Sequence, residues 1–235
     1  MDMKLLTSHE TLDYLLYNKC SMARFGDGEN GFIQKSKGVP TMQKYNKGLR
    51  QGLHRVIFHP PESLLLCVHD EDTYSYVPHR TYGNSFVTRP TNTGLATDDY
   101  FVKFKQLWAG RDVHIINFYP GVVNSPMFDN VNDISYQSIP MRHCFGLFDQ
   151  IKQELQPHLD KNKVFLLSCG PTATILAAAL AESGEYALDV GKILFEYAKF
   201  MGDSFENLVK YLSQDVLAPK HKTWRKNNGM GIHGE

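Results

Sequence analysis

Two acidic residues and an arginine stand close together in the segment MARFGDGENGFIQ. Asp27 and Glu29 are two positions apart, and Arg24 stands three positions before the first acid. In an extended segment, residues i and i+2 point to the same side, so both carboxylates could converge on one cation or hydroxyl. Arg24 could neutralise the acids or bind a phosphate through two parallel hydrogen bonds. A solvated acidic turn paired to Arg24 explains the same residues, and spacing alone favours this simpler interpretation.

A second candidate site follows the apolar run FLLSC, which enters a turn at Gly170. Thr172 stands where a helix is expected to begin, and free N–H groups at a helix N-terminus bind phosphates or carboxylates. Asp189 closes the next predicted strand, 19 residues after Gly170. An acid at about this spacing binds ribose hydroxyls in doubly wound nucleotide folds. A tight connection with Thr172 as a plain N-cap is the competing interpretation, and the incomplete glycine pattern argues against a dinucleotide.

Other residues give weaker signals. Gly26 and Gly28 flank the first acid and would let the backbone approach a ligand closely. Arg89 follows a β-like stretch and precedes Pro90, where a surface role is more common than a ligand clamp. The ten histidines show no HxH or HExxH spacing, which argues against a histidine metal cage. The four cysteines lack any CxxC pair, which argues against a zinc site or a disulfide framework and favours reduced thiols. They are Cys20, Cys67, Cys144 and Cys169.

The composition is that of a soluble globular protein without a dominant charge. The chain has 235 residues, with 25 basic and 25 acidic side chains. Because no global field attracts nucleic acid, we expect no nucleic-acid partner, and a charged ligand must be held by a local cluster. No apolar stretch approaches the roughly 20 residues of a membrane span. The N-terminus lacks the apolar segment of a signal peptide, so a cytoplasmic location is expected.

The elements that must position these residues alternate between strand and helix. The pattern predicts one α/β domain over residues 1–215, with a mainly parallel sheet flanked by helices, and a basic, glycine-rich tail over 216–235. Thr7 and Glu10 fit a capping box. Strands are expected at 21–25, 63–69, 112–121, 163–168 and 186–191. Helices are expected at 7–19, 43–58, 98–109, 143–157, 171–184 and 193–213, and a loop with one short helix over the thirty residues after 69.

Taken together, several motifs stand in the order found in one family. They are ARFGDGE, SFVTRP, LWAGRDVHII, MFDN, CGPTATILAAAL and ALDVGKILFEY. Over about residues 20 to 200 the chain resembles the GT-D glycosyltransferases, also catalogued as DUF1792. The resemblance implies a Rossmann-like enzyme that moves a hexose from a nucleotide sugar, typically UDP-glucose, to a glycan or glycoprotein acceptor. Such enzymes serve bacterial surface glycosylation from the cytoplasmic side, near the inner face of the membrane. They use a DxE motif and usually a divalent metal, expected to be Mn²⁺.

Carried over residue by residue, the DxE motif is Asp27 and Glu29, which would hold the metal. Asp189 and Glu196 would line the same cleft. Because the acceptor hydroxyl needs a general base, which a cleft carboxylate can supply, our hypothesis is that Glu196 or Asp189 is the base. Asp189 could instead bind only ribose, and Glu196 could pair with Lys192 one turn earlier. The residues expected to bind the nucleotide sugar are Arg24, Gly26, Gly28, Arg89, Gly170, Thr172, Asp189 and Lys192.

One position departs from the family pattern. Lys192 stands where the family often has a histidine, in DVGKI instead of DIGHI. If that histidine helps to hold the metal, the metal assignment is weakened here, and a lysine could place its own charge on the leaving diphosphate. Two other functions explain part of the sequence: a Rossmann-like S-adenosylmethionine-dependent methyltransferase, and an inactive subunit that binds nucleotide sugars. The sequence leaves the oligomeric state open, and a homo-oligomer is compatible with it.

Overall fold

Buried apolar strands form the centre of the molecule. The structure is a computed structural model that describes residues 4–35, 43–69, 80–202 and 223–225. β3 (Leu64–Val68) is buried at every position, as is β7 (Lys163–Ser168) apart from its first residue. Such strands are typical of a parallel sheet that is covered on both faces.

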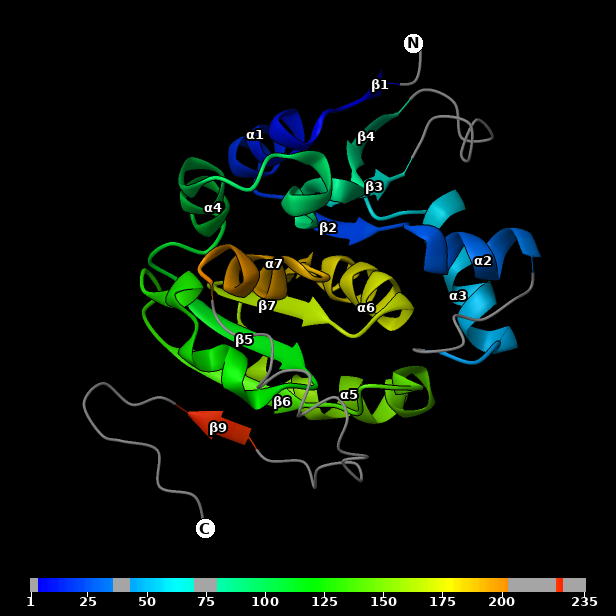
Figure 1. Cartoon of the computed structure of the whole chain (residues 1–235). Helices are drawn as coiled ribbons and strands as arrows, with labels where there is room; N and C mark the ends of the chain where they lie inside the picture. Colours follow the sequence, from blue (N-terminus) through cyan, green and yellow to red (C-terminus); the bar gives the residue numbers. More distant parts are fainter. Residues whose placement is uncertain (1–3, 36–42, 70–79, 203–222, 226–235) are drawn as a thin grey trace.

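The described strands form one nine-stranded sheet in the order β1-β4-β3-β2-β8-β7-β5-β6-β9 (Figure 1). Each pairing is parallel except that of β6 with β9, which is antiparallel. The expected α/β fold with a mainly parallel sheet is therefore confirmed. The remaining strands are β1 (Lys4–Leu5), β2 (Ser21–Arg24), β4 (Thr81–Asn84), β5 (Asp112–Asn117), β6 (Ile134–Ser138), β8 (Tyr186–Asp189) and β9 (Thr223–Arg225).

Helices cover the sheet on both faces. They are α1 (Ser8–Asn18), α2 (Asp27–Lys35), α3 (Lys47–Phe58), α4 (Asp98–Lys105), α5 (Phe148–Leu155), α6 (Pro171–Glu182) and α7 (Ile193–Phe200). One buried cluster includes Leu53 of α3 and Leu176 of α6. A second cluster includes Leu12 of α1, Phe101 of α4 and Leu194 of α7. The sheet lies between these two cores, which together bury both of its faces.

The order of the strands brings distant parts of the chain together at the middle of the sheet. The strands from β2 to β4 lie on one side, β5 and β6 lie on the other, and β7 and β8 return to the centre. Met22 of β2 is therefore paired with Leu188 of β8. In open α/β sheets, ligands bind outside the carboxyl ends of the strands, where the strand order reverses. The carboxyl ends of β2, β8 and β7 form this edge here.

Several predicted elements are confirmed. Thr7 and Glu10 form the capping box of α1. The strands predicted at 21–25, 63–69, 112–121, 163–168 and 186–191 are β2, β3, β5, β7 and β8. The helix predicted at 43–58 begins only at Lys47, because the Asn46 side chain caps it. The helix predicted at 98–109 is shorter and ends at Lys105.

Other expectations are corrected. The predicted glycine turn around Asp27 is the start of helix α2, and β4 lies within the predicted loop. The helix predicted at 143–157 begins at Phe148, after a 3₁₀ turn over Cys144–Leu147. The helix predicted at 193–213 ends at Phe200, and residues 203–222 lie outside the described part of the chain. Within the predicted tail, residues 223–225 form β9.

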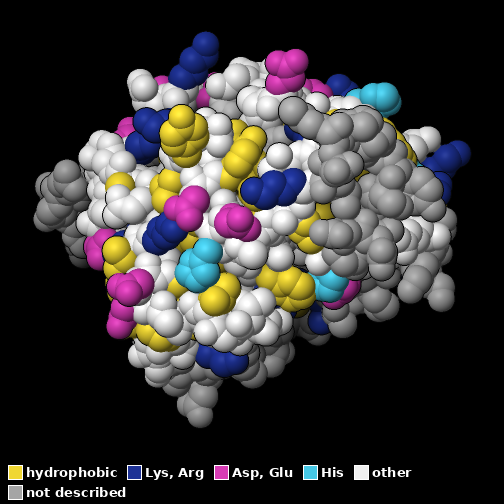
Figure 2. Space-filling view, turned by 90° about the horizontal axis from the view of Figure 1, so that it is seen from above, with side chains coloured by type: hydrophobic (Ala, Val, Ile, Leu, Met, Phe, Trp, Pro, Cys, Tyr) yellow, Lys and Arg dark blue, Asp and Glu magenta, His cyan; other side chains and the backbone are white. Residues whose placement is uncertain are grey.

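The mixed character of the surface and the absence of a long apolar helix among the described residues agree with the balanced composition. Seen from the side of β1, acidic, basic and hydrophobic side chains are mixed on the coloured part of the surface (Figure 2). Among the described residues, no helix combines the length and the apolar character needed to cross a bilayer.

Candidate functional site

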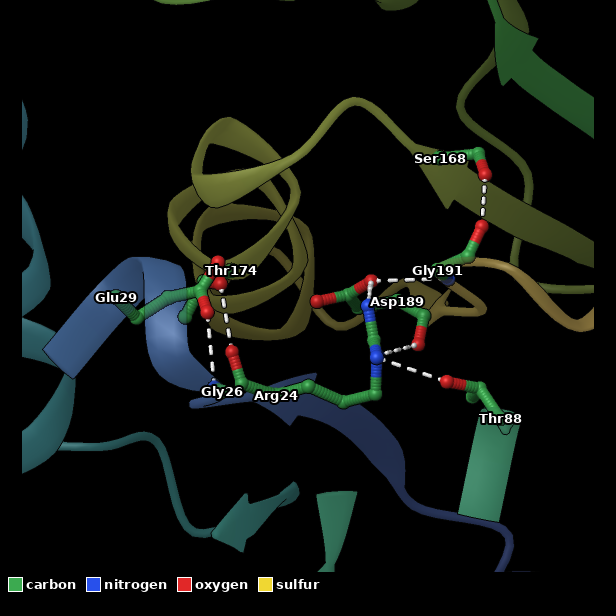
Figure 3. Close-up of polar contacts among 8 residues, drawn as sticks. All are labelled: Arg24, Gly26, Glu29, Thr88, Ser168, Thr174, Asp189 and Gly191. Carbon is green, nitrogen blue, oxygen red and sulfur yellow. Dashed lines mark hydrogen bonds and ion pairs between the residues drawn. The ribbon is translucent and has the colours of Figure 1, made fainter. Parts of the chain in front are cut away.

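Arg24 is held at the end of β2 by partners from the end of β8 and from the 3₁₀ turn after β4 (Figure 3). Its Nε donates to the backbone oxygen of Asp189 at 3.0 Å, and its Nη2 donates to Asp189 Oδ1 at 3.0 Å. Its Nη1 donates to Thr88 Oγ1 at 2.8 Å. Arg24 is therefore paired with Asp189, 165 positions away, and not with the neighbouring acids as the simpler interpretation supposed.

Asp189 is an almost fully buried carboxylate, with 2% of its side chain exposed. Burial raises the pKa of Asp189 above its ordinary value, an effect that the Arg24 guanidinium opposes. Asp189 Oδ1 also accepts from the backbone N of Gly191 at 3.2 Å. Since Arg24 and the backbone occupy Asp189 Oδ1, the structure gives Asp189 a role in holding Arg24.

Gly191 packs directly against Arg24. Its φ is +48°, and a Cβ placed on it would lie 2.0 Å from Arg24 Nη2. Its carbonyl oxygen accepts a hydrogen bond from Ser168 Oγ at the end of β7. Glycine is therefore required here both by the left-handed backbone and by the close approach of the guanidinium.

The two acids of the DxE motif lie in the first turn of α2. The extended geometry assumed from the sequence is wrong: at 3.6 residues per turn, positions i and i+2 leave a helix about 200° apart. Glu29 Oε2 accepts from the Gly26 N–H at 2.8 Å and caps the helix. In Figure 3 the Glu29 carboxylate lies beside Gly26, at the opposite end of Arg24 from the guanidinium. Asp27 is exposed.

Electrostatics also distinguish the two acids. Burial raises the pKa of Glu29 above its ordinary value, and the charge of Asp189 adds to this effect, while Arg24 opposes it. Asp27 forms no hydrogen bond or ion pair with another described residue through its carboxylate. Asp27 is therefore the acid of the motif that can bind a ligand without breaking an existing contact.

The start of α6 lies at the same edge of the sheet. Gly170, with φ +60°, is the N-cap residue, and no side chain caps this helix. The expectation that Thr172 is a plain N-cap is therefore wrong. Thr172 is fully buried, and its Oγ1 has no hydrogen-bond partner. Thr174 Oγ1 donates to the Arg24 backbone oxygen at 2.9 Å, which ties α6 to β2.

The segment 85–94 connects β4 to α4 and contains the 3₁₀ turns η2 (Ser85–Thr88) and η3 (Pro90–Thr93). Arg89 lies between these turns and is half-buried, and its Nε has no partner. Thr91 donates to Glu196 Oε2 from its backbone N at 3.2 Å and also from its hydroxyl. Glu196 is therefore bonded to this segment, and among the described residues it forms no ion pair with Lys192, which is exposed at the start of α7.

The described residues do not form a metal cage by themselves. No group of three or more His, Cys, Asp or Glu side chains among them is placed to hold a metal ion. One or two carboxylates are nevertheless enough where substrate phosphates supply the remaining ligands. The exposed Asp27 fits that kind of shared site, whereas Glu29 leaves the helix about 200° away and bonds to the Gly26 N–H.

The structure thus joins residues that the sequence kept apart. Arg24 and Asp189 bond to each other at the carboxyl edge where the strand order reverses, and Thr174 ties the start of α6, which holds Gly170 and Thr172, to the Arg24 backbone. Sequence reasoning missed four residues that hold this arrangement: Thr88, Thr91, Ser168 and Gly191. Thr88 lies in SFVTRP and Gly191 in ALDVGKILFEY, Thr91 directly follows the first of these motifs, and Ser168 directly precedes CGPTATILAAAL. These positions in or beside the motifs are the signal that could have identified the four residues.

Known proteins resemble this chain over most of its length. A probable glycosyl transferase, Gly, of Streptococcus gordonii is 32% identical over 230 residues, which is 85% of this chain and 33% of the relative. The glycosyltransferase GlyD of Streptococcus pneumoniae serotype 4 is 28% identical over 219 residues, which is 80% of this chain and 26% of the relative. The chain spans only about a third or less of these curated relatives.

Solved structures share the fold. The structure described as "A New Glycosyltransferase (DUF1792) from Streptococcus sanguinis" superimposes with a TM-score of 0.73 at 27% identity, over 86% of each chain. Another, described as "The highly conserved domain of unknown function 1792 has a distinct glycosyltransferase fold", has a TM-score of 0.72 at 26% identity and covers 86% of this chain and 83% of that one.

The family model described as "Glycosyltransferase GT-D fold" matches residues 69–214, which contain Arg89, Thr172, Asp189 and Glu196. The match begins after Asp27 and Glu29, but the structural neighbours extend the likeness to 86% of the chain. The chain therefore belongs to the GT-D glycosyltransferase-fold family.

Proposed function

We propose that this protein transfers a hexose, with glucose as the first candidate, from a UDP-sugar to a glycan or glycoprotein acceptor in bacterial surface glycosylation. One observation carries the proposal. At the carboxyl edge of the sheet, the uncapped start of α6 and the buried, unpartnered Thr172 hydroxyl lie beside the strand end that bears Arg24. This arrangement favours an anionic ligand such as a diphosphate.

The leaving diphosphate gains negative charge as the sugar–phosphate bond breaks, and fixed positive groups stabilise that charge. Arg24 is largely neutralised by Asp189 and retains two N–H donors beyond its present bonds. Arg89 has no described counter-ion and would supply the larger share of positive charge. Lys192, exposed beside Gly191, would add to it.

A divalent metal, for which Mn²⁺ is the expected ion, would be held by Asp27 together with the diphosphate, because Glu29 leaves the helix about 200° away. When bound, such an ion supplies further positive charge to the leaving group. The carboxylate of Asp27 would orient the donor from the side of α2, and Glu29 would keep the Gly26 backbone in place through its existing hydrogen bond.

Thermal unfolding with added ligands tests this proposal. We expect UDP with Mn²⁺ to raise the midpoint and the protein to transfer or hydrolyse the sugar of UDP-glucose. Asp27→Asn should lose most of this activity, whereas Asp149→Asn, at an exposed position on α5, should keep it. Stabilisation by S-adenosylmethionine instead of UDP would indicate the methyltransferase, and UDP binding without any turnover would indicate the inactive subunit.

A further inference from the structure

Two attachments tie the segment 85–94 to the rest of the site, one on each side of Arg89. Before Arg89, the Thr88 hydroxyl accepts from Arg24 Nη1 at 2.8 Å. After it, Thr91 donates twice to Glu196 Oε2 on α7. Because these contacts flank Arg89 in the chain, they fix the backbone on both sides of that residue.

Arg89 is the charged residue that this arrangement presents. Its side chain is half-buried, its Nε is buried without a partner, and no described carboxylate forms an ion pair with it. Arg24, by contrast, is bonded to Asp189. A partly desolvated guanidinium without a counter-ion attracts an anion, and its planar donors suit phosphate oxygens.

The contact with Thr91 changes what Glu196 can do. Glu196 Oε2 accepts from both the N–H and the hydroxyl of Thr91, so both lone pairs of this oxygen are occupied. Taking a proton from an acceptor hydroxyl at this atom would break the link between α7 and η3. At Oε2 the geometry favours a structural link, while Oε1 forms no bond with a described residue.

We propose that Glu196 and Thr91 form a latch that positions Arg89 to bind a diphosphate. Glu196 is then a positioning residue, acting through Thr91 and the backbone of η3. The ligand class rests on the proposed function, because the diphosphate is that of the sugar donor. The latch itself rests on the two hydrogen bonds and on the unpaired charge between the two attachments.

Calorimetry with inorganic pyrophosphate, and separately with UDP, tests the latch. Thr91→Val and Glu196→Ala should each weaken pyrophosphate binding about three- to tenfold, and the double variant should bind no more weakly than Glu196→Ala. Arg89→Ala should weaken pyrophosphate binding by at least about tenfold. The matched control is Thr93→Val, because the Thr93 hydroxyl bonds to the Pro90 oxygen within the same turn and should leave affinity unchanged. If Glu196→Ala fails to fold, Thr91→Val carries the comparison alone.

Glu196→Gln distinguishes a latch from a base. Its amide oxygen can still accept from Thr91, so this variant should recover most of the affinity lost in Glu196→Ala. In a plot of kcat against pH, Glu196→Gln should also show the same decrease at acidic pH as the wild type. A kcat loss of about a hundredfold in Glu196→Gln, together with loss of that decrease at acidic pH, would identify Glu196 as the base and overturn the proposal.

The two proposals fail in different ways. If pyrophosphate binding depends on Arg89, Thr91 and Glu196 but UDP-glucose is not turned over, the latch stands and the proposed function is wrong. If Arg89→Ala binds pyrophosphate as tightly as the wild type, or if Thr91→Val matches Thr93→Val, the latch is wrong even in an active transferase. Absence of any pyrophosphate binding by the wild type also refutes it.

Discussion

At the scale of single residues, the site depends on how Arg24 is held. Its three hydrogen-bonding nitrogens contact Thr88 and both the backbone and the carboxylate of Asp189. Gly191 closes the remaining side, where any larger residue would meet the guanidinium. Arg24 therefore has one permitted position, which is the preorganisation that an anion site needs.

The first prediction concerns Gly191→Ala. The new Cβ would lie 2.0 Å from Arg24 Nη2 and 2.3 Å from Cζ, so the guanidinium must move. We expect UDP affinity to fall by about tenfold or more, and the free energy of unfolding by about 2 kcal/mol or more. Isothermal calorimetry and urea denaturation measure these two quantities.

Gly110→Ala is the matched control for this change. Gly110 has φ +67°, but nothing lies within 4 Å of the position of its Cβ. It shares the backbone strain without the clash, so we expect a loss of about 1 kcal/mol of stability and unchanged UDP affinity. Equal UDP affinity in both variants would show that the position of Arg24 does not matter for binding.

At the scale of elements, α2 is the helix that sequence reasoning could not find. Two glycines, Gly28 and Gly31, and several polar residues give the segment a low helix propensity. Contacts from elsewhere stabilise it: Arg50 of α3 donates from Nε to the Phe32 oxygen at 3.2 Å and from Nη2 to the Ile33 oxygen at 3.4 Å. Arg50 thereby satisfies carbonyls in the last turn of α2.

The second prediction follows from this contact. Arg50→Met should lower the free energy of unfolding by about 1–2 kcal/mol, because it removes charge-assisted bonds to two partly buried carbonyls. It should also speed amide exchange in α2 and weaken the binding of the UDP-sugar donor, because α2 carries Asp27. Denaturant titration, hydrogen exchange and UDP calorimetry measure these effects.

Arg55→Met, on the same helix, is the control for Arg50→Met. Arg55 pairs with Glu182 at 2.9 Å, but the two side chains are 69% and 42% exposed. Its loss should cost less than about 1 kcal/mol and leave exchange in α2 unchanged. If Arg50→Met behaves like Arg55→Met, then α3 does not stabilise the helix that carries the two acids.

The same elements show what the sequence could predict. Continuous apolar runs and a glycine turn are enough to predict β3, β7 and α6, because these elements are formed mainly by buried apolar residues. β6 was not predicted, although Ile134 and Tyr136 alternate with polar residues in the manner of a strand. The polar residues of β6 are buried as well, and Ser135 bonds to the buried His114 of β5. The pairing of Arg24 with Asp189 requires the order of strands in the sheet, which local patterns do not contain.

At the scale of the whole molecule, one buried polar cluster lies on β5 and β6, which follow β7 in the sheet on the side away from β8 and β2. His114 of β5 is fully buried, and its Nδ1 lies 2.7 Å from Ser135 Oγ of β6. Its ring packs 4.5 Å from that of His158. Burial lowers the pKa of His114 from 6.5 to about 3, and the nearby His158 and Lys163 add to this effect. The neutral imidazole is therefore part of the folded core.

The last prediction is an acid sensitivity that comes from this histidine. Below about pH 6.5 the unfolded chain binds a proton at His114, whereas the folded protein does not until about pH 3. The unfolded state then holds more protons, so the free energy of unfolding falls as the pH drops through this window. The difference between the two pKa values of His114 sets the size of this fall, which is on the order of a few kcal/mol. His114→Gln should flatten the fall, and His59→Gln, at an exposed position after α3, should keep the wild-type dependence. Urea titrations from pH 7 to pH 4 measure this difference, and equal slopes in His114→Gln and the wild type would show that another group controls acid stability.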